Sequence, residues 1–161
     1  MVRMTVQRVG IDPSRQALVI LADAEEKRLL PILIGLFEAQ SIAMAISGED
    51  IGRPLTHDLM LSVIRELGWD LERIEVTKLA QQTFYALLHI QCDGNIIEVD
   101  ARPSDAIALA LRADAPIFVS EEVLDRAQII DDASDSEQDE EDVEKFKDLL
   151  DKIELDEDET G

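Results

Sequence analysis

Polar and charged side chains gather in three short segments that lie beside apolar runs. Residues 53–58 form the first segment, residues 100–105 form the second, and the third surrounds Glu38. Turns at the ends of strands and helices carry functional residues more often than the interiors of these elements do. The candidate functional residues of the three segments are Glu38, Arg53, His57, Asp58, Asp100, Arg102, Ser104 and Asp105.

Three carboxylates of this set have the chemistry to bind a metal ion. Carboxylate oxygens are the ligands that Mg²⁺ and Mn²⁺ prefer in proteins. We therefore predict that Glu38, Asp100 and Asp105 bind a divalent cation of this kind.

The remaining candidates have the chemistry to activate water and to hold a phosphate. An imidazole accepts a proton near neutral pH, so His57 with Asp58 is expected to activate water, and Arg102 completes the predicted catalytic set. Guanidinium groups bind phosphate in a bidentate manner, and helix N-termini offer free N–H groups. This chemistry predicts that Arg53, Arg102 and Ser104 bind a substrate phosphate. Metal-assisted hydrolysis of a phosphodiester uses these parts together.

The same residues also have a purely structural interpretation. Thr56 with Asp58, and Ser104 with Asp105, are sufficient as the caps of two helices. In this interpretation His57, which follows the first cap, is a solvated surface residue.

Hydrophobic periodicity predicts the elements that would position these residues. Alternating or continuous apolar runs indicate strands, and apolar residues spaced three and four apart indicate helices. Two strand-to-helix units, residues 32–46 and 97–111, are similar at an offset of 65 residues. The order of elements predicts an α+β fold, in which a mixed or antiparallel sheet of hairpins packs with helices. The predicted strands cover 2–6, 17–22, 29–34, 74–76, 83–92, 97–101 and 117–119, and the predicted helices cover 37–46, 56–67, 106–112 and 121–127.

The charge of the chain is unevenly distributed. The 161 residues carry 15 Lys+Arg and 36 Asp+Glu, a formal net charge of −21, and residues 131–161 hold 16 of the acids with three lysines. A boundary near Ile130 therefore separates a folded domain at 1–130 from an acidic linker and tail. Apolar spacing at residues 143–153 predicts a short amphipathic helix in this tail, which either docks on its own domain or binds a partner.

Composition also excludes several classes of protein. One cysteine rules out a disulfide framework and a Cys-rich zinc site. The longest apolar run, residues 29–37, is far shorter than the ~20 residues of a membrane span, and residues 1–6 alternate like a strand rather than a signal peptide. The acidic charge argues against a general polyanion binder. We expect a cytoplasmic protein that binds no membrane.

Three longer motifs resemble one known family. They are LPILIGLFEAQ at 30–40, RPLTHDL at 53–59 and DARPSDAIALA at 100–110, in this order. At these residues the chain resembles the bifunctional nuclease domain family over about residues 1–130, and tail residues 143–147 resemble the ending of bacterial members. The resemblance implies nuclease activity on both RNA and DNA.

These observations lead to one main hypothesis and two alternatives. The main hypothesis is a divalent-metal-assisted nuclease, with Mg²⁺ or Mn²⁺ as the cofactor and RNA or DNA as a transient substrate. The first alternative is a non-catalytic oligomeric module that binds an anion or a protein. The second is an acidic adaptor that binds a protein partner through its tail. Apolar side chains expected at the surface predict homo-oligomer formation; they are Trp69, Tyr85 and Leu87.

Overall fold

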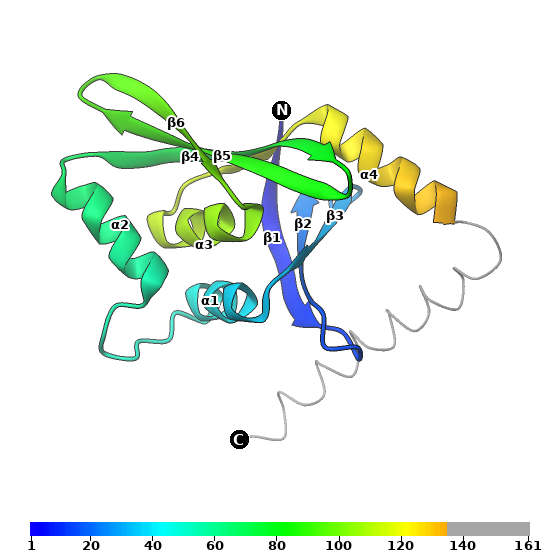
Figure 1. Ribbon diagram of the computed structural model, residues 1–161, viewed down its shortest axis with the longest axis horizontal. Coiled ribbons are helices and arrows are strands. Elements are labelled where there is room, and N and C mark those ends of the chain that lie inside the picture. Colours follow the sequence, from blue (N-terminus) through cyan, green and yellow to red (C-terminus); the bar gives the residue numbers. More distant parts are fainter. Residues whose placement is uncertain (135–161) are drawn as a thin grey trace. The chain divides into compact units, whose positions relative to one another are not determined.

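Two antiparallel three-stranded meanders make up most of a seven-stranded sheet (Figure 1). The computed structural model describes residues 1–134 of the chain. The strand order is β3–β2–β1–β7–β4–β5–β6, and β7 pairs in parallel with β4. The sheet is therefore mixed, and the predicted α+β fold is confirmed. The strands are β1 (Val2–Ile11), β2 (Ala17–Asp23), β3 (Leu29–Ile34), β4 (Asp70–Ala80), β5 (Thr83–Cys92), β6 (Asn95–Ala101) and β7 (Ile117–Val119).

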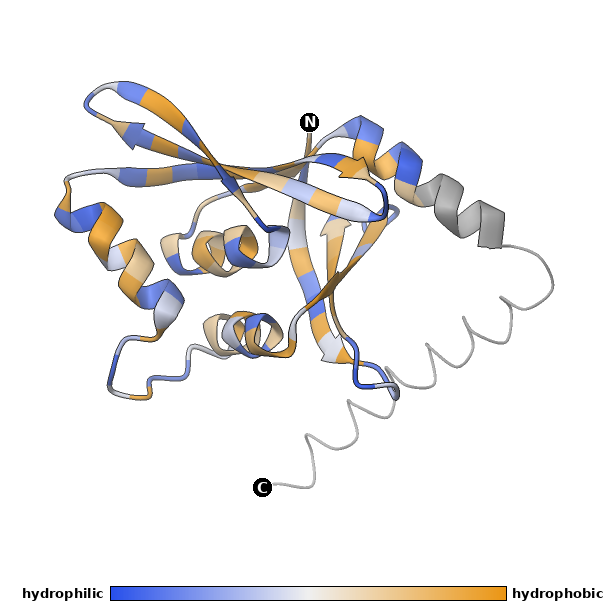
Figure 2. Ribbon diagram, in the orientation of Figure 1, coloured by the Kyte–Doolittle hydropathy of each residue, from blue (hydrophilic) through white to orange (hydrophobic). Residues whose placement is uncertain are grey.

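Two central helices, α1 and α3, pack against each other and against the sheet. Helix α1 contacts β1 and β2, α3 contacts β4 and β5, and α2 packs on α3. Ile42 of α1 and both Ile107 and Leu109 of α3 are fully buried, and each such side chain stabilises the fold by about 1.5–3 kcal/mol. Hydrophobic and hydrophilic residues alternate along β1, whereas β2 and β3 are predominantly hydrophobic (Figure 2). The helices are α1 (Leu36–Ser47), α2 (Thr56–Glu66), α3 (Pro103–Ala113) and α4 (Glu121–Ser134).

Each meander runs directly into a helix, so the fold contains a repeated unit. Strand β3 leads into α1 through the N-cap Gly35, and β6 leads into α3 through the N-cap Arg102. The two units are therefore offset by 67 residues, not by the predicted 65. Because strand side chains alternate with a period of two, a two-residue slip preserves the apolar match and hides the error. The corrected offset makes Glu38 and Asp105 equivalent, each at the third position of its helix.

The starts of α2 and α3 differ from the predicted caps. The N-cap residues are Leu55 and Arg102, and neither makes a side-chain capping bond. Thr56 and Ser104 already lie inside the helices, so their prediction as caps is wrong. At α2 the capping contact comes instead from Asp58, whose Oδ2 accepts the backbone N–H of Leu55 at 2.8 Å. A short polar run does not determine which of its residues is the first with helical backbone dihedrals. For this reason the sequence did not identify the N-caps of α2 and α3.

The last helix extends further than the sequence predicts. Helix α4 ends at Ser134 rather than near Ala127, four residues into the segment predicted as an acidic linker. No glycine or proline interrupts this stretch of sequence, and acidic residues alone do not end a helix. The predicted tail helix at 143–153 lies outside the described residues. Within the described part of the chain, Met1–Asp125 forms one compact unit, and no helix is long and apolar enough to cross a membrane.

Candidate functional site

Side chains from α1, α2 and α3 form one hydrogen-bonded cluster, which we call the helix-junction network. One arm begins at Arg102, whose Nε donates to Asp105 Oδ2 at 2.8 Å and whose Nη2 donates to Glu38 Oε1 at 2.8 Å. His57 of α2 continues the arm, because its Nε2 lies 2.9 Å from Asp105 Oδ1 and its Nδ1 lies 2.7 Å from Ser41 Oγ. This arm joins the N-terminal halves of the three helices.

Arg112, in the last turn of α3, carries the second arm. Its Nε donates to Asp58 Oδ1 at 2.7 Å, its Nη1 donates to the Ala108 carbonyl at 2.9 Å, and its Nη2 donates to the Ser41 carbonyl at 3.1 Å. The N–H of Leu55 and, to a smaller extent, Arg112 hold the pKa of Asp58 below its ordinary value. Ser41 belongs to both arms, through its hydroxyl and its carbonyl. The network consists of Glu38, Ser41, His57, Asp58, Arg102, Asp105 and Arg112.

Burial divides the network into a closed centre and an open end. His57 is 7% exposed and Ser41 is 9% exposed, whereas the Arg102 side chain is 65% exposed. Burial raises the pKa of Asp105, but hydrogen bonds from Arg102 and His57 outweigh it and leave that pKa below its ordinary value. The same carboxylate contacts, first with Asp105 and then with Glu38, raise the pKa of the Arg102 guanidinium. The network therefore stays charged at neutral pH at its open end.

His57 occupies the closed centre with both ring nitrogens engaged. When Nε2–H donates to Asp105, Nδ1 accepts the hydroxyl proton of Ser41, which satisfies the neutral ring completely. A general base must reach the proton that it takes. Water activation by His57 therefore needs the network to open, and this role stays a prediction.

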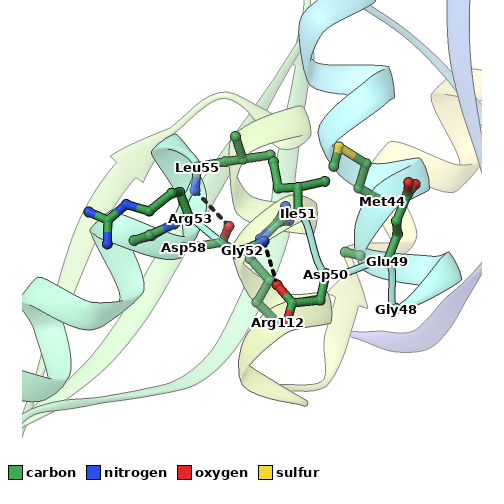
Figure 3. A pocket seen from close by; sticks show the side chains of 12 residues that line it. Met44, Gly48, Glu49, Asp50, Ile51, Gly52, Arg53, Leu55, Asp58 and Arg112 are labelled. Atoms are coloured by element: carbon green, nitrogen blue, oxygen red, sulfur yellow. Dashed lines mark hydrogen bonds and ion pairs between the residues drawn. The ribbon is translucent and has the colours of Figure 1, made fainter.

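A pocket of about 450 Å³ lies beside the second arm (Figure 3). The end of α1, the loop from α1 to α2, the start of α2 and Arg112 of α3 line it. Two residues of the predicted site, Arg53 and Asp58, also line it. In Figure 3 the exposed Arg53 side chain extends away from Met44 and Glu49 on the other side of the pocket. The apolar part of the wall consists of Met44, Ala45, Ile51, Pro54 and Leu55.

The predicted metal ligands do not gather into a preformed metal site. Among the described residues, no group of three or more His, Cys, Asp or Glu side chains is arranged to hold an ion. Glu38 and Asp105 both bind the cation of Arg102, and Asp100 is exposed on β6, opposite Leu87 of β5. The donors do not fit a metal ion as they are arranged here, so metal binding by these three carboxylates stays a prediction.

Comparison with known proteins identifies the family of this chain. The family model for the bifunctional nuclease domain matches residues 19–132. The chain belongs to the bifunctional nuclease domain family. A Mycobacterium tuberculosis relative, described as an uncharacterized protein, is 44% identical over 156 residues, which cover 92% of this chain and 93% of the relative.

Plant members of the family are more distant and longer. Bifunctional nuclease 1 of Arabidopsis thaliana is 29% identical over 107 residues, which cover 65% of this chain and 33% of that protein. Bifunctional nuclease 2 of Oryza sativa subsp. japonica is 29% identical over 106 residues, covering 64% and 33%. This chain therefore matches about a third of each of these plant nucleases.

All eight candidate residues lie within the bifunctional nuclease domain, and the structure distributes them over three places. Arg53 lines the pocket, together with Asp58 from the network. Asp100 is exposed on β6, whereas Ser104 is 5% exposed in the first turn of α3. The helix-junction network contains the other candidates, which are Glu38, His57, Asp58, Arg102 and Asp105.

Two members of the network are absent from the sequence-based candidates. Arg112 lies seven residues after Asp105, and Ser41 lies three residues after Glu38, so each shares a helix face with a residue that was chosen. An arginine at the end of the buried, apolar helix α3 is itself a signal, since such a charge needs partners. Helical spacing from the chosen carboxylates could have identified both residues.

Proposed function

We propose that this chain hydrolyses phosphodiester bonds of RNA and DNA with the assistance of a divalent cation, Mg²⁺ or Mn²⁺. The observation that carries the proposal is the family match, because it spans every candidate residue and because plant relatives are named bifunctional nucleases. This activity is transferred from proteins of which the chain covers only a third, and it needs direct measurement.

The exposed arginines are the groups best suited to receive a substrate phosphate. A guanidinium has five N–H donors, and Arg102 uses two of them on Asp105 and Glu38. Three donors remain on a side chain that the two carboxylates hold in place. Arg53 makes no hydrogen bond or ion pair within the described residues. Both side chains can therefore make charge-assisted hydrogen bonds to a phosphate.

A bound divalent cation would supply charge stabilisation at the phosphate. The carboxylates available for it are Asp100, Glu38 and Asp105, of which the last two hold Arg102 in this structure. The metal requirement is therefore measured separately in the cleavage experiment described next.

Cleavage of labelled single-stranded RNA and DNA by the purified chain tests the proposal. We expect cleavage with Mg²⁺ or Mn²⁺, loss of cleavage with a chelator, and loss of cleavage in Asp100→Ala and His57→Ala. Arg15→Gln, which alters an exposed arginine in the β1–β2 turn, is the control and keeps the activity. Circular dichroism of His57→Ala separates lost activity from lost fold. Cleavage at the parent rate by both alanine variants would reveal a contaminating nuclease and overturn the proposed site.

A non-catalytic binding module is the second candidate function. The observation that favours it is the closed network, in which arginines hold the carboxylates and His57 is buried. An oligomeric module also fits the apolar surface of β3 and α1, where Leu33 is 66% exposed and Phe37 is 85% exposed. Binding of single-stranded RNA without cleavage under every metal condition would favour this candidate.

Location and the role of the tail complete the proposal. We propose a cytoplasmic location, which cell fractionation tests. An acidic adaptor would lose its protein partner when residues 131–161 are deleted, while cleavage by the remaining domain would be unchanged.

A further inference from the structure

The pocket beside α2 has the size and the rigidity of a small-ligand site. Its volume of about 450 Å³ lies within the roughly 300–1,000 Å³ that is typical of ligand pockets. Gly48 (φ 67°) and Gly52 (φ 79°) adopt the left-handed conformation in its loop, which suits glycine. Asp50 Oδ1 accepts the Gly52 N–H at 2.8 Å. The loop is thus held by its own contacts, and its wall is formed before any ligand arrives.

Arg112 contributes buried hydrogen-bond donors to this pocket. Its side chain is 10% exposed and lines the cavity. Three of its five N–H donors bind Asp58, the Ala108 carbonyl and the Ser41 carbonyl. One N–H on Nη1 and one on Nη2 are left over. Each guanidinium nitrogen of Arg112 already has one acceptor, so the two remaining N–H groups are available to an anionic group in the pocket.

The rim of the pocket carries charges of both signs. Arg53 brings an exposed cation without an ion-pair partner in the described part of the chain. Glu49 and Asp50 line the same pocket and repel a long run of negative charge. One phosphate of a strand can therefore bind at the arginines, while the neighbouring phosphates stay outside the pocket.

We propose that this pocket binds one unpaired nucleotide of a nucleic-acid substrate. Its phosphate contacts Arg53 and Arg112, and its base lies against the apolar wall formed by Met44, Ile51 and Leu55. The inference rests on the proposed nuclease function, and it specifies the substrate class as single-stranded nucleic acid. A base in a duplex must leave its stack to enter a pocket of this kind. Because the wall is apolar, it offers little discrimination among the four bases.

Titration of the full chain with AMP, UMP and adenosine, followed by calorimetry, tests this site without requiring cleavage. We expect AMP and UMP to bind with dissociation constants within about threefold of each other, and adenosine to bind about tenfold more weakly because it lacks the phosphate. Arg53→Gln should reduce the advantage of AMP over adenosine, because Arg112 is then the only arginine that contacts the phosphate. Ile51→Asp should weaken both ligands, because it places a charge on the wall that receives the base.

Arg15→Gln is the matched control, since it removes an equally exposed arginine from the β1–β2 turn. Unchanged AMP affinity in Arg53→Gln, or adenosine binding as tightly as AMP, would overturn the inference. The two proposals fail separately. AMP binding without cleavage retains the nucleotide site and rejects the nuclease, whereas cleavage without AMP binding rejects the nucleotide site alone.

Discussion

At the residue scale, the sequence shows which side chains carry charge but not which charges meet. Glu38 and Asp105 have the chemistry of metal ligands, and the structure sets both of them against Arg102. The sequence predicts His57 with Asp58 as the water-activating pair and Asp105 as a metal ligand, and the structure joins all three in one network. Their partners could not be read from the sequence, because a hydrogen bond such as that from His57 to Asp105 joins residues 48 positions apart.

Removal of the His57 ring should destabilise the domain. His57→Ala leaves Ser41 and Asp105 without their buried partner, and each unsatisfied buried polar group costs about 1–3 kcal/mol. We therefore expect the free energy of unfolding in urea to fall by roughly 2–4 kcal/mol. The neighbouring Thr56→Ala is the control. Thr56 is exposed and is not a cap, so this change should stay within about 0.5 kcal/mol.

The two variants also test the assignment of the cap. A loss of about 1 kcal/mol in Thr56→Ala would mean that the threonine does cap α2. A loss below about 0.5 kcal/mol in His57→Ala would mean that the closed centre of the network contributes nothing to stability.

The lowered pKa of Asp58 predicts a pH dependence of stability. The Leu55 N–H and Arg112 hold this pKa below its ordinary value in the folded protein. A depressed folded pKa stabilises the fold above the unfolded pKa, and this stabilisation is lost as the pH falls through the folded pKa. Asp58→Asn should therefore be less stable than the parent at about pH 6, and the difference should shrink as the pH falls below the ordinary carboxyl pKa of about 4.

Urea unfolding at a series of pH values measures this difference. The difference between the parent and Thr56→Ala should stay constant over the same series, because no carboxylate is removed. A difference for Asp58→Asn that stays constant down to about pH 2 would show that Asp58 contributes through shape and not through its charge.

At the element scale, periodicity predicted the order of strands and helices but not their exact registers. The strand-to-helix repeat was visible in the residues, and β3–α1 and β6–α3 confirm it as a feature of the fold. The two-residue error in its offset arose because apolar alternation repeats every two residues. The predicted helix starts were also wrong. Leu55, and not Thr56, is the N-cap of α2, because the N-cap depends on where the chain leaves the preceding loop.

The C-terminal ends of the two repeated helices predict opposite effects of substitution. Gly48 follows α1 with φ 67°, and Asp114 follows α3 with φ 54°. A side chain in this left-handed region costs about 1 kcal/mol, and less for Asp. Gly48→Ala should lower the free energy of unfolding by about 1 kcal/mol through backbone strain alone, since nothing lies within 4 Å of the added Cβ.

Asp114→Gly, at the exposed residue that ends α3, should be neutral or stabilising by up to about 0.5 kcal/mol. Thermal unfolding of both variants tests the pair. A stabilised Gly48→Ala would show that the α1 end does not require the left-handed conformation and that the two ends are not equivalent.

At the whole-molecule scale, the net charge of −21 divides into a tail of −13 and a domain of −8 at the boundary expected from sequence. The distribution of charge along the chain can be counted from the sequence. Its effect on nucleic-acid binding depends on where the nucleic acid binds. Arg53 and Arg102 are exposed on a domain with a net negative charge. The two arginines attract the phosphates of a nucleic acid locally, whereas the domain as a whole repels them. The acidic tail adds 13 net negative charges, so we predict that it repels nucleic acid and competes with it for these arginines.

Deletion of residues 135–161 should strengthen binding of single-stranded nucleic acid. The cut keeps α4 intact to Ser134 and removes 14 acidic residues and three lysines. Affinity for a labelled 20-nucleotide DNA, measured by fluorescence anisotropy with a chelator present, should rise about three- to tenfold at roughly 20 mM salt. Near 0.5 M salt the gain should disappear, because salt then screens charges that are more than about 4 Å apart. A full-length chain with Asn and Gln in place of the tail acids is the control, and it should match the truncated protein. Equal affinity of the parent and the truncated chain at low salt would show that the tail does not repel or compete with nucleic acid.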